Sequence, residues 1–249
     1  MTESWQKVSG LSWTLAKANF KLRTEGSYLG VLWYLLDPVL LFAILIYVFG
    51  SNLGASIKFY PLYLIWGLVM FNFFTTVTSQ ATSVIVNNAL FIKSMKIRSE
   101  VLVVSILLQT IFSHLFEIIV LVALTVYFGA SLLSLLIYLP IFIFFCALTL
   151  GISFFLAAFG VYVSDLNNVW KFFTQALFFA TPIFYASAKP LILLLNPLAS
   201  FLAITRGLII YHEWPGLKII SLSAITSVLA LFVGWYLFSL VKNKFAENL

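Results

Sequence analysis

The stretch from Phe20 to Phe49, FKLRTEGSYLGVLWYLLDPVLLFAILIYVF, decides the fold of this chain. A basic, polar leader turns within a few residues into an apolar run long enough to cross a bilayer, which needs about 20 helical residues. A secretory signal peptide has a short apolar core and a small-residue cleavage site close behind its first charges, and Met1 to Gly30 offers neither. We therefore expect an integral membrane protein that keeps its leader.

Composition extends this expectation to all 249 residues, which are 63% hydrophobic, 18% aromatic and only 9% charged. These values exclude a soluble domain, because most side chains must face lipid or other spans. The net charge of +6 is typical of basic residues that flank apolar spans, whereas a nucleic-acid surface needs a dense basic patch. The single cysteine, Cys146, excludes an intrachain disulfide and a CxxC metal site.

Six apolar segments have membrane length, and the sequence predicts spans at about residues 31–50, 60–84, 101–128, 132–163, 169–188 and 217–241. The intervening piece, residues 189–214, is apolar but is broken by Asn196-Pro197 and carries Arg206. Proline breaks a helix, and a cation at mid-bilayer costs about 3 kcal/mol or more. We expect this piece to form two short half-helices that dip into the outer leaflet and return.

The positions of the lysines and arginines fit a cytoplasmic N-terminus with either six or seven spans, so the broken piece decides the topology. Since that piece is predicted not to span, we expect six spans with both termini cytoplasmic. The predicted fold is an all-α integral membrane domain over residues 1–249. It consists of six transmembrane helices, an N-terminal amphipathic interface helix and a re-entrant outer helical hairpin between spans five and six.

The leader, residues 1–29, has apolar residues three or four positions apart, at Trp5, Val8, Leu11, Leu15, Ala18 and Leu22. Lys7, Lys17 and Lys21 lie away from this line. The spacing predicts an amphipathic helix in the inner membrane interface. It leaves open whether the helix anchors in lipid or docks a protein.

A second cytoplasmic piece, residues 86–100, joins the second and third predicted spans. Asn87 and Asn88 are good N-caps for a short helix over Ala89–Met95, which carries Leu90, Phe91 and Ile92 beside Lys93 and Lys96. Three adjacent large apolar residues on such a loop would be exposed unless something covers them. The pattern favours a partner-binding helix over an ordinary basic loop.

Catalytic motifs are missing from the sequence. It has no Gly-Lys pair and hence no phosphate-binding GxxxxGK[ST] loop, and it has no GxSxG or HExxH. We expect no catalytic residues and no metal site. His114 and Glu117, three residues apart on one helical face, are compatible with a proton relay, a hydrogen-bonded packing pair or a polar spot on a pathway. A metal would need more ligands, and His212 is the only other histidine.

Four motifs occur in order along essentially the whole chain: GSYLGVLW at 26–33 with Asp37-Pro38, the loop Asn87 to Lys93, TPIFY at 181–185, and Asn196-Pro197 with Arg206-Gly207. Together they resemble the ABC-2-type permease subunits that export lipid-linked polysaccharides such as O-antigen, capsule or teichoic acid. The chain departs from that pattern at Asp37, where such proteins often have Asn or another residue, and by lacking prolines near Arg98 and Val103. These departures affect what the resemblance implies about the end of the cytoplasmic loop and about the class of sugar that is exported.

The resemblance implies a six-span subunit that forms a homodimer and docks on a separate ATPase, which would hold the ATP and Mg, with no cofactor bound by this chain. The helix over 86–100 would be the coupling helix, with contacts from Asn87, Asn88, Leu90, Phe91, Lys93 and Lys96. Residues 181–211 would form the outer gate, with Pro182, Tyr185, Asn196, Pro197 and Arg206. The leader would lie beside the ATPase at the plasma (inner) membrane of a prokaryote.

A sugar polymer needs a pathway of flat faces with few strong charges, so aromatic residues are candidates for its lining. These candidates are Trp33, Tyr34, Phe71, Phe73, Phe74 and Phe178, with Asp37 near the substrate entrance. The nearest alternative is an ABC-2 exporter of drugs or small lipids. A proton-coupled secondary transporter would use His114 and Glu117, and a membrane enzyme would need a cluster of acidic residues that the eight scattered carboxylates do not provide.

Overall fold

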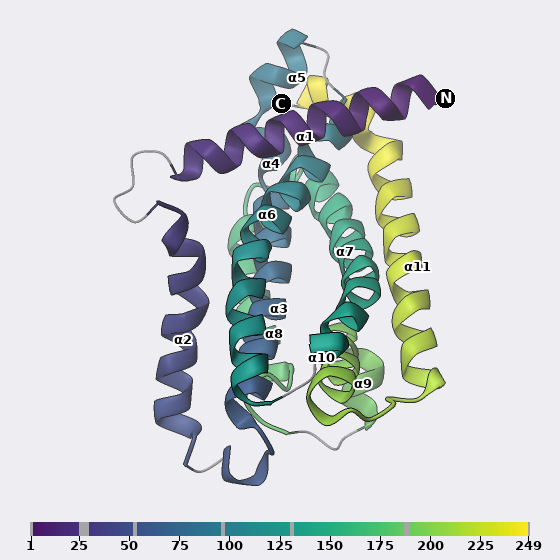
Figure 1. Ribbon diagram of the computed structural model, residues 1–249. Helices are drawn as coiled ribbons and strands as arrows, with labels where there is room; N and C mark the ends of the chain where they lie inside the picture. The colour runs from purple at the N-terminus through teal and green to yellow at the C-terminus, as the bar shows by residue number, and fades with distance from the viewer. Residues whose placement is uncertain are drawn as a thin grey trace.

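A computed structural model describes residues 2–24, 30–51, 54–95, 98–129, 132–186 and 190–248. The described residues form helices and connecting turns and no strands, so the chain is all-α, as the sequence predicts. Long helices run side by side between two ends of the molecule (Figure 1). Both termini lie at one end, which we call the terminal end, and the short helices α9 and α10 lie at the opposite end.

The four described helices long and apolar enough to cross a membrane are α3 (Tyr60–Ala81), α6 (Glu100–Tyr127), α7 (Leu132–Gly160) and α11 (Leu217–Val241). Two shorter helices run beside them, α2 (Trp33–Phe49) with 17 residues and α8 (Leu166–Ala180) with 15. At ~1.5 Å per residue these two are about 26 and 23 Å long, somewhat less than a bilayer core of about 30 Å.

The core of the bundle surrounds α3. Every residue from 62 to 70 of this helix is buried, because α2, α6, α7, α8 and α10 all pack against it. Trp66 meets Tyr138 of α7 edge-on, and Phe73 lies among His114, Phe142 and Phe145. The central position of α3 explains why its hydropathy is the lowest of the four candidate spans: it faces protein more than lipid.

α7 and α11 lie in backbone contact. A Cβ atom placed on Gly151 would overlap the backbone at Ala230 and Leu231, and one on Gly234 would overlap the carbonyl of Gly151. Small residues at such a contact let two membrane helices approach closely. The two helices therefore form one packed pair.

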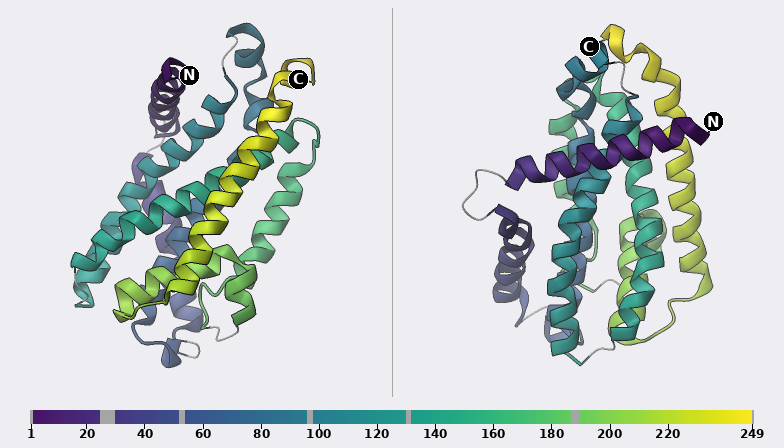
Figure 2. Two further views of the ribbon diagram at one scale, coloured as in Figure 1. Left: turned by 90° about the vertical axis from the view of Figure 1, so that its right-hand side faces the viewer. Right: turned by 45° about the horizontal axis from the view of Figure 1, so that its top comes forward.

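α1 (Thr2–Thr24) lies across the terminal end and packs on α6 (Figures 1 and 2). The predicted helix is present, and only part of the predicted apolar line lies in its contact with the bundle. Val8, Ser12 and Ala16 are buried, whereas Leu22 is 68% exposed. Ser12 donates to the carbonyl of Val101 at 3.3 Å, so small residues set the contact with α6 and part of the apolar line faces outward.

Two short helices, α4 (Val84–Asn87) and α5 (Ala89–Met95), follow α3 at the terminal end, and the second covers the range in which the sequence predicts a short helix. The chain ends beside them with η4 (Lys242–Lys244) and α12 (Phe245–Asn248). The side chains of Asn87 and Asn88 donate backwards to Ser83 and Val84, so they close α4.

The opposite end holds η2 (Gly54–Ser56), α9 (Pro190–Leu195), α10 (Pro197–Arg206) and a π-helical turn, η3 (Gly207–Tyr211); η1 (Gly30–Leu32) precedes α2. The predicted fifth span is too long at its C-terminal end. α8 stops at Ala180, and Thr181 is extended because the next residue is Pro182, which disfavours the helical region for its predecessor.

Candidate functional site

Arg206, the last residue of α10, is caged by backbone carbonyls. Its side chain is only 3% exposed. Nη1 donates to the carbonyl of Pro182 at 2.6 Å, and Nη2 donates to those of Tyr63 and Ile183 at 2.9 Å each. Nε also donates to the Tyr63 carbonyl, and the guanidinium carbon lies 3.4 Å from the centre of the Tyr63 ring. A buried cation is thus stabilised by several dipoles and one aromatic face.

Tyr63 of α3 extends this cage. Its hydroxyl lies 2.9 Å from the carbonyl of Tyr185 and 3.2 Å from that of Pro182, so one O–H is shared between the two acceptors. The Tyr185 hydroxyl in turn donates to the carbonyl of Phe179 in α8. Burial raises the pKa of the Tyr185 phenol above its usual value, helped by Tyr63, so its hydroxyl stays protonated as a donor. The segment 181–185, which forms a turn and a bend, is therefore held by α3, α8 and α10 together.

Asn196 fixes the start of α10. Its side-chain oxygen accepts from the backbone N–H groups of Leu198 and Ala199 at 3.0 and 3.4 Å, and its amide donates to the hydroxyl of Thr181 at 2.8 Å. Pro197 occupies the first helical position, where a missing N–H costs nothing. The five residues that the sequence predicts for the outer gate thus lie in one connected group.

A groove of about 260 Å³ runs between α3 and α8. Aromatic rings and polar side chains line it, namely Phe71, Thr75, Thr174, Gln175, Phe178 and Phe179. The Phe71 and Phe178 rings meet edge-on, with centroids 5.3 Å apart. Ser79 and Gln80 on α3 are half-buried, and Asn168 and Lys171 on α8 are exposed, so polar groups continue toward the terminal end on both helices. Such a surface offers flat faces and hydroxyl or amide partners.

The other predicted pathway residues have different surroundings. Phe73 and Phe74 are buried, the first against α6 and α7 and the second against Trp170 of α8. Trp33, at the start of α2, is exposed. Tyr34 and Asp37 belong to α2, but their side chains lie outside what the structure describes. The structure therefore brings Phe71 and Phe178 together and separates them from the two buried phenylalanines.

His114 and Glu117 lie in a buried hydrogen-bond network. His114 Nδ1 is 2.8 Å from Glu117 Oε2, His114 Nε2 is 2.8 Å from the Tyr138 hydroxyl, and Asn72 donates to Glu117 Oε1 at 2.9 Å. The network joins α3, α6 and α7 at the level of the aromatic core. Both ring nitrogens and both carboxylate oxygens have partners, which is the arrangement that makes a buried polar cluster stable. Within the described residues no three His, Cys, Asp or Glu side chains could hold a metal ion together.

α5 presents an apolar surface at the terminal end. Leu90 is 82% exposed and Phe91 is about half exposed, whereas Ile92 is buried against the bundle. Asn87 and Lys93 are exposed and Asn88 is half-buried, while Lys96 lies outside the described residues. Large exposed apolar side chains of this kind mark an interaction surface.

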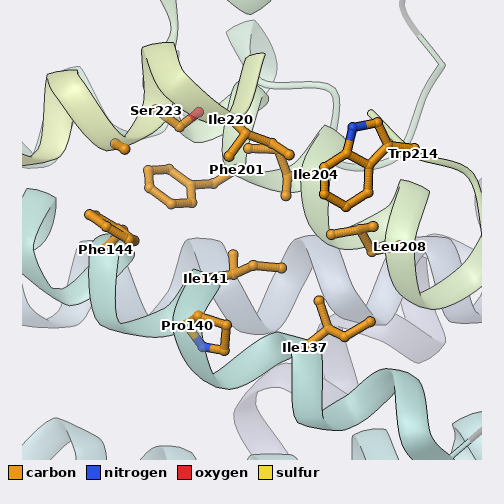
Figure 3. Close-up of a pocket in the computed structure, with 11 residues that line it drawn as sticks. Ile137, Pro140, Ile141, Phe144, Phe201, Ile204, Leu208, Trp214, Ile220 and Ser223 are labelled. Carbon is orange, nitrogen blue, oxygen red and sulfur yellow. The ribbon is translucent and has the colours of Figure 1, made fainter. Parts of the chain in front are cut away.

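A second, apolar pocket of about 210 Å³ lies between α7, α10 with η3, and α11 (Figure 3). Ile137, Pro140, Ile141 and Phe144 of α7 face Phe201, Ile204 and Leu208, and Trp214 closes one end. Ser223 supplies a buried hydroxyl with no hydrogen-bond partner among the described atoms. Its lining is apolar apart from the Ser223 hydroxyl and the ring N–H of Trp214.

Comparison with known families matches residues 11–210 to the ABC-2 type transporter family. The chain belongs to this family. An ABC-2 member is a transport subunit of the membrane, which agrees with the apolar helices and with the resemblance carried by the four sequence motifs.

Similar ABC-2 proteins include three O-antigen export system permease proteins named RfbA. One from Myxococcus xanthus is 25% identical over 248 residues, covering 96% of this chain and 95% of the relative. Two from Klebsiella pneumoniae are 29% and 26% identical over 246 and 242 residues, each covering 94% of this chain and 93% of the relative. The alignments therefore run over nearly the full length of both partners.

Sequence reasoning missed several residues of this ABC-2 permease that the structure places in buried polar contacts. Tyr63 completes the cage of Arg206, and Glu100 forms ion pairs with Lys242 and Arg98. Glu100 is the one carboxylate next to the basic loop at 93–98, which is a usable signal. The role of Tyr63 leaves no signal in sequence, because its partners are backbone carbonyls far along the chain.

Proposed function

We propose that this chain is the permease subunit of an ATP-driven exporter that moves a lipid-linked polysaccharide outward across the plasma membrane. The observation that carries the proposal is the groove between α3 and α8, in which Phe71 and Phe178 lie beside hydroxyl and amide groups. Such a lining lets a sugar chain stack and exchange hydrogen bonds without being trapped by a strong charge. The full-length similarity to O-antigen export permeases supports the same substrate class.

The proposed topology has six spans, α2, α3, α6, α7, α8 and α11, with the terminal end in the cytoplasm. Basic residues support this orientation, since Lys93, Arg98, Lys242 and Lys244 all belong to segments of the terminal end. α9 and α10 would be the re-entrant hairpin of the outer gate. The carbonyl cage of Arg206 supports this assignment, because it lets a cation lie at membrane depth while shielded from lipid.

The proposed partners are a separate ATPase, which would bind ATP and Mg, and a second copy of this chain. The exposed face of α5, centred on Leu90 and Phe91, would dock in the ATPase. Nucleotide-driven movement of the ATPase would push α5 and open the path toward segment 181–185. The lack of a phosphate-binding loop in the sequence supports assigning hydrolysis to the partner.

The test is export of lipid-linked glycan in proteoliposomes that contain the permease with and without its ATPase. Leu90→Glu should reduce ATPase copurification and export by at least about tenfold, because a charge replaces a buried apolar anchor of the interface. Leu217→Glu is the matched control, since Leu217 is an exposed leucine at the opposite end. Export that continues without ATPase, or an unaffected Leu90→Glu variant, would overturn the proposal.

A further inference from the structure

A lysine near the C-terminus of the chain forms an ion pair with a buried carboxylate. Glu100, the first residue of α6, is only 2% exposed. Its Oε1 atom is 2.6 Å from Lys242 Nζ at the end of α11 and 3.2 Å from Arg98 Nη2. A buried carboxylate needs such partners, and removing one of them leaves a charge that is poorly solvated. The two ends of the pair are 142 residues apart in sequence.

An aromatic contact accompanies this ion pair. Phe245, three residues after Lys242, is fully buried and meets Phe238 of α11 edge-on with centroids 5.3 Å apart. α12, which begins at Phe245, packs against α5, and the C-terminus lies beside α5 in Figure 1. The buried Ile92 lies on the side of α5 opposite to the exposed Leu90. The last residues of the chain therefore contact α5, while the side chain of Leu90 stays exposed.

α11 connects this support to the opposite end of the molecule. It packs along α7 through the backbone contact at Gly151 and Gly234, so the two helices cannot slide apart without losing close contact. At its other end α11 packs against α10, the helix that carries Arg206. α11 thus runs from the η4 and α12 tail, which contacts α5, to the helix that carries Arg206.

We propose that Glu100, Lys242 and Phe245 are positioning residues that form a C-terminal clamp. The Glu100–Lys242 ion pair joins the start of α6 to the end of α11, and Phe245 holds α12, which contacts α5, against α11. Movement of α5 then passes through the clamp to the α7 and α11 pair. The clamp rests on the proposed function, because the ATPase supplies the movement. The exposed face of α5 takes up the push, and the clamp passes it to α11. Without the clamp, α5 still docks the ATPase but moves independently of the bundle.

The first test measures positioning and does not depend on transport. Amide hydrogen exchange of residues 89–95 is compared in purified wild type, Lys242→Met and Phe245→Ala. We expect exchange in α5 to be at least about fivefold faster in both variants, while exchange in the α7 and α11 core is unchanged. Lys244→Met is the matched control, since Lys244 is exposed on the same tail and its side chain has no role in the clamp.

The second test measures transmission. Glu100→Gln, Lys242→Met and the double variant are reconstituted with the ATPase, and export is divided by ATP hydrolysed. Each single variant should lower this ratio by about tenfold with ATPase copurification retained, and the double variant should be no worse than either single one because both act through one interaction. Lys244→Met should match wild type.

The outcomes separate the clamp from the function on which it rests. Unchanged exchange of α5 in Lys242→Met and Phe245→Ala overturns the clamp, whatever the transport assay gives. Faster exchange with an unchanged ratio of export to hydrolysis overturns transmission through it. Wild-type export that needs no ATPase overturns the proposed function, and the exchange experiment then still decides whether the clamp positions α5.

Discussion

At the scale of single residues, Arg206 is a buried cation that has carbonyl partners and no carboxylate partner among the described residues. The Arg206 guanidinium is stabilised by hydrogen bonds to the carbonyls of Tyr63, Pro182 and Ile183, which come from α3 and from the segment after α8. The planar guanidinium can reach all three at once because its donors point in fixed, divergent directions. Gly67 makes room for it, since a Cβ there would overlap the guanidinium.

We predict that Arg206→Met destabilises the permease by about 3 kcal/mol, because three buried carbonyls lose a charged donor. A loss of this size lowers the thermal unfolding midpoint by roughly 6 to 12 °C. Arg206→Lys should fall between wild type and Arg206→Met, since an ammonium lacks the fork. Melting curves in detergent check this, with Lys218→Met, a change at an exposed lysine, as the control. Equal midpoints for Arg206→Met and wild type would contradict the role of the cage.

The buried side chains of His114 and Glu117 also depend on partners from other helices. His114 and Glu117 are compatible in sequence with either a proton relay or a packing pair, and the structure surrounds them with Asn72 and Tyr138. Each partner comes from a different helix, so spacing along one helix could not reveal it. The closed network favours the structural role of the pair.

At the scale of helices, α7 and α11 pack closely because glycines stand at their contact, where larger side chains would keep the two backbones apart. Gly151 and Gly234 place two backbones together, a packing that lipid-embedded helices use because apolar burial alone drives them together only weakly. In contrast, Gly10 on α1 has no heavy atom near the position of a Cβ. The chain therefore has helical glycines in two kinds of surroundings: some are crowded by a neighbouring backbone, and one faces open space.

We predict that Gly151→Ala and Gly234→Ala each destabilise the permease by about 1–3 kcal/mol, because the added methyl forces the two backbones apart. Gly10→Ala should be neutral or stabilising by up to about 1 kcal/mol, since alanine is the better helix former and the space is open. Thermal unfolding of the three purified variants measures the difference. If Gly10→Ala is as damaging as Gly151→Ala, close packing of the α7 and α11 backbones does not explain the effect.

Helix limits could be predicted from sequence to different degrees. α11 begins and ends where the apolar pattern predicts, at Leu217 and Val241, because basic and turn residues flank a clean apolar run. α8 was predicted too long, because the apolar letters continue past Thr181-Pro182 although the backbone leaves the helix there. The apolar residues predict the orientation of α1 only in part, since Ser12 and Ala16 share its buried face with Val8.

At the scale of the whole molecule, the two ends differ in the helices and charged residues that they carry. The terminal end carries the exposed α5 and most of the basic residues, and the opposite end carries the caged Arg206 with α9 and α10. In the proposed function, docking of the ATPase at the terminal end is coupled to movement at the opposite end. α3, α6, α7 and α11 all run between the two ends.

We predict that single cysteines introduced in a Cys146→Ala background separate into two classes. Lys58→Cys and Glu213→Cys, at exposed positions of the opposite end, should react with an impermeant maleimide in intact cells. Lys93→Cys and Lys244→Cys should react only after permeabilisation, because six spans leave both termini inside. Reaction of Lys244→Cys in intact cells would instead require seven spans, with residues 189–214 crossing the membrane.

The sequence by itself determined that the chain is an all-helical membrane protein, where its apolar helices lie, and that a short helix follows Asn88. These properties are local, because they depend on the length of apolar runs and on the residues that flank them. The tertiary structure alone decided which polar groups meet. Arg206 reaches a carbonyl 143 residues away and Lys242 a carboxylate 142 residues away, contacts set by how helices face one another. Composition cannot show which of these groups meet, because backbone carbonyls are present at every position.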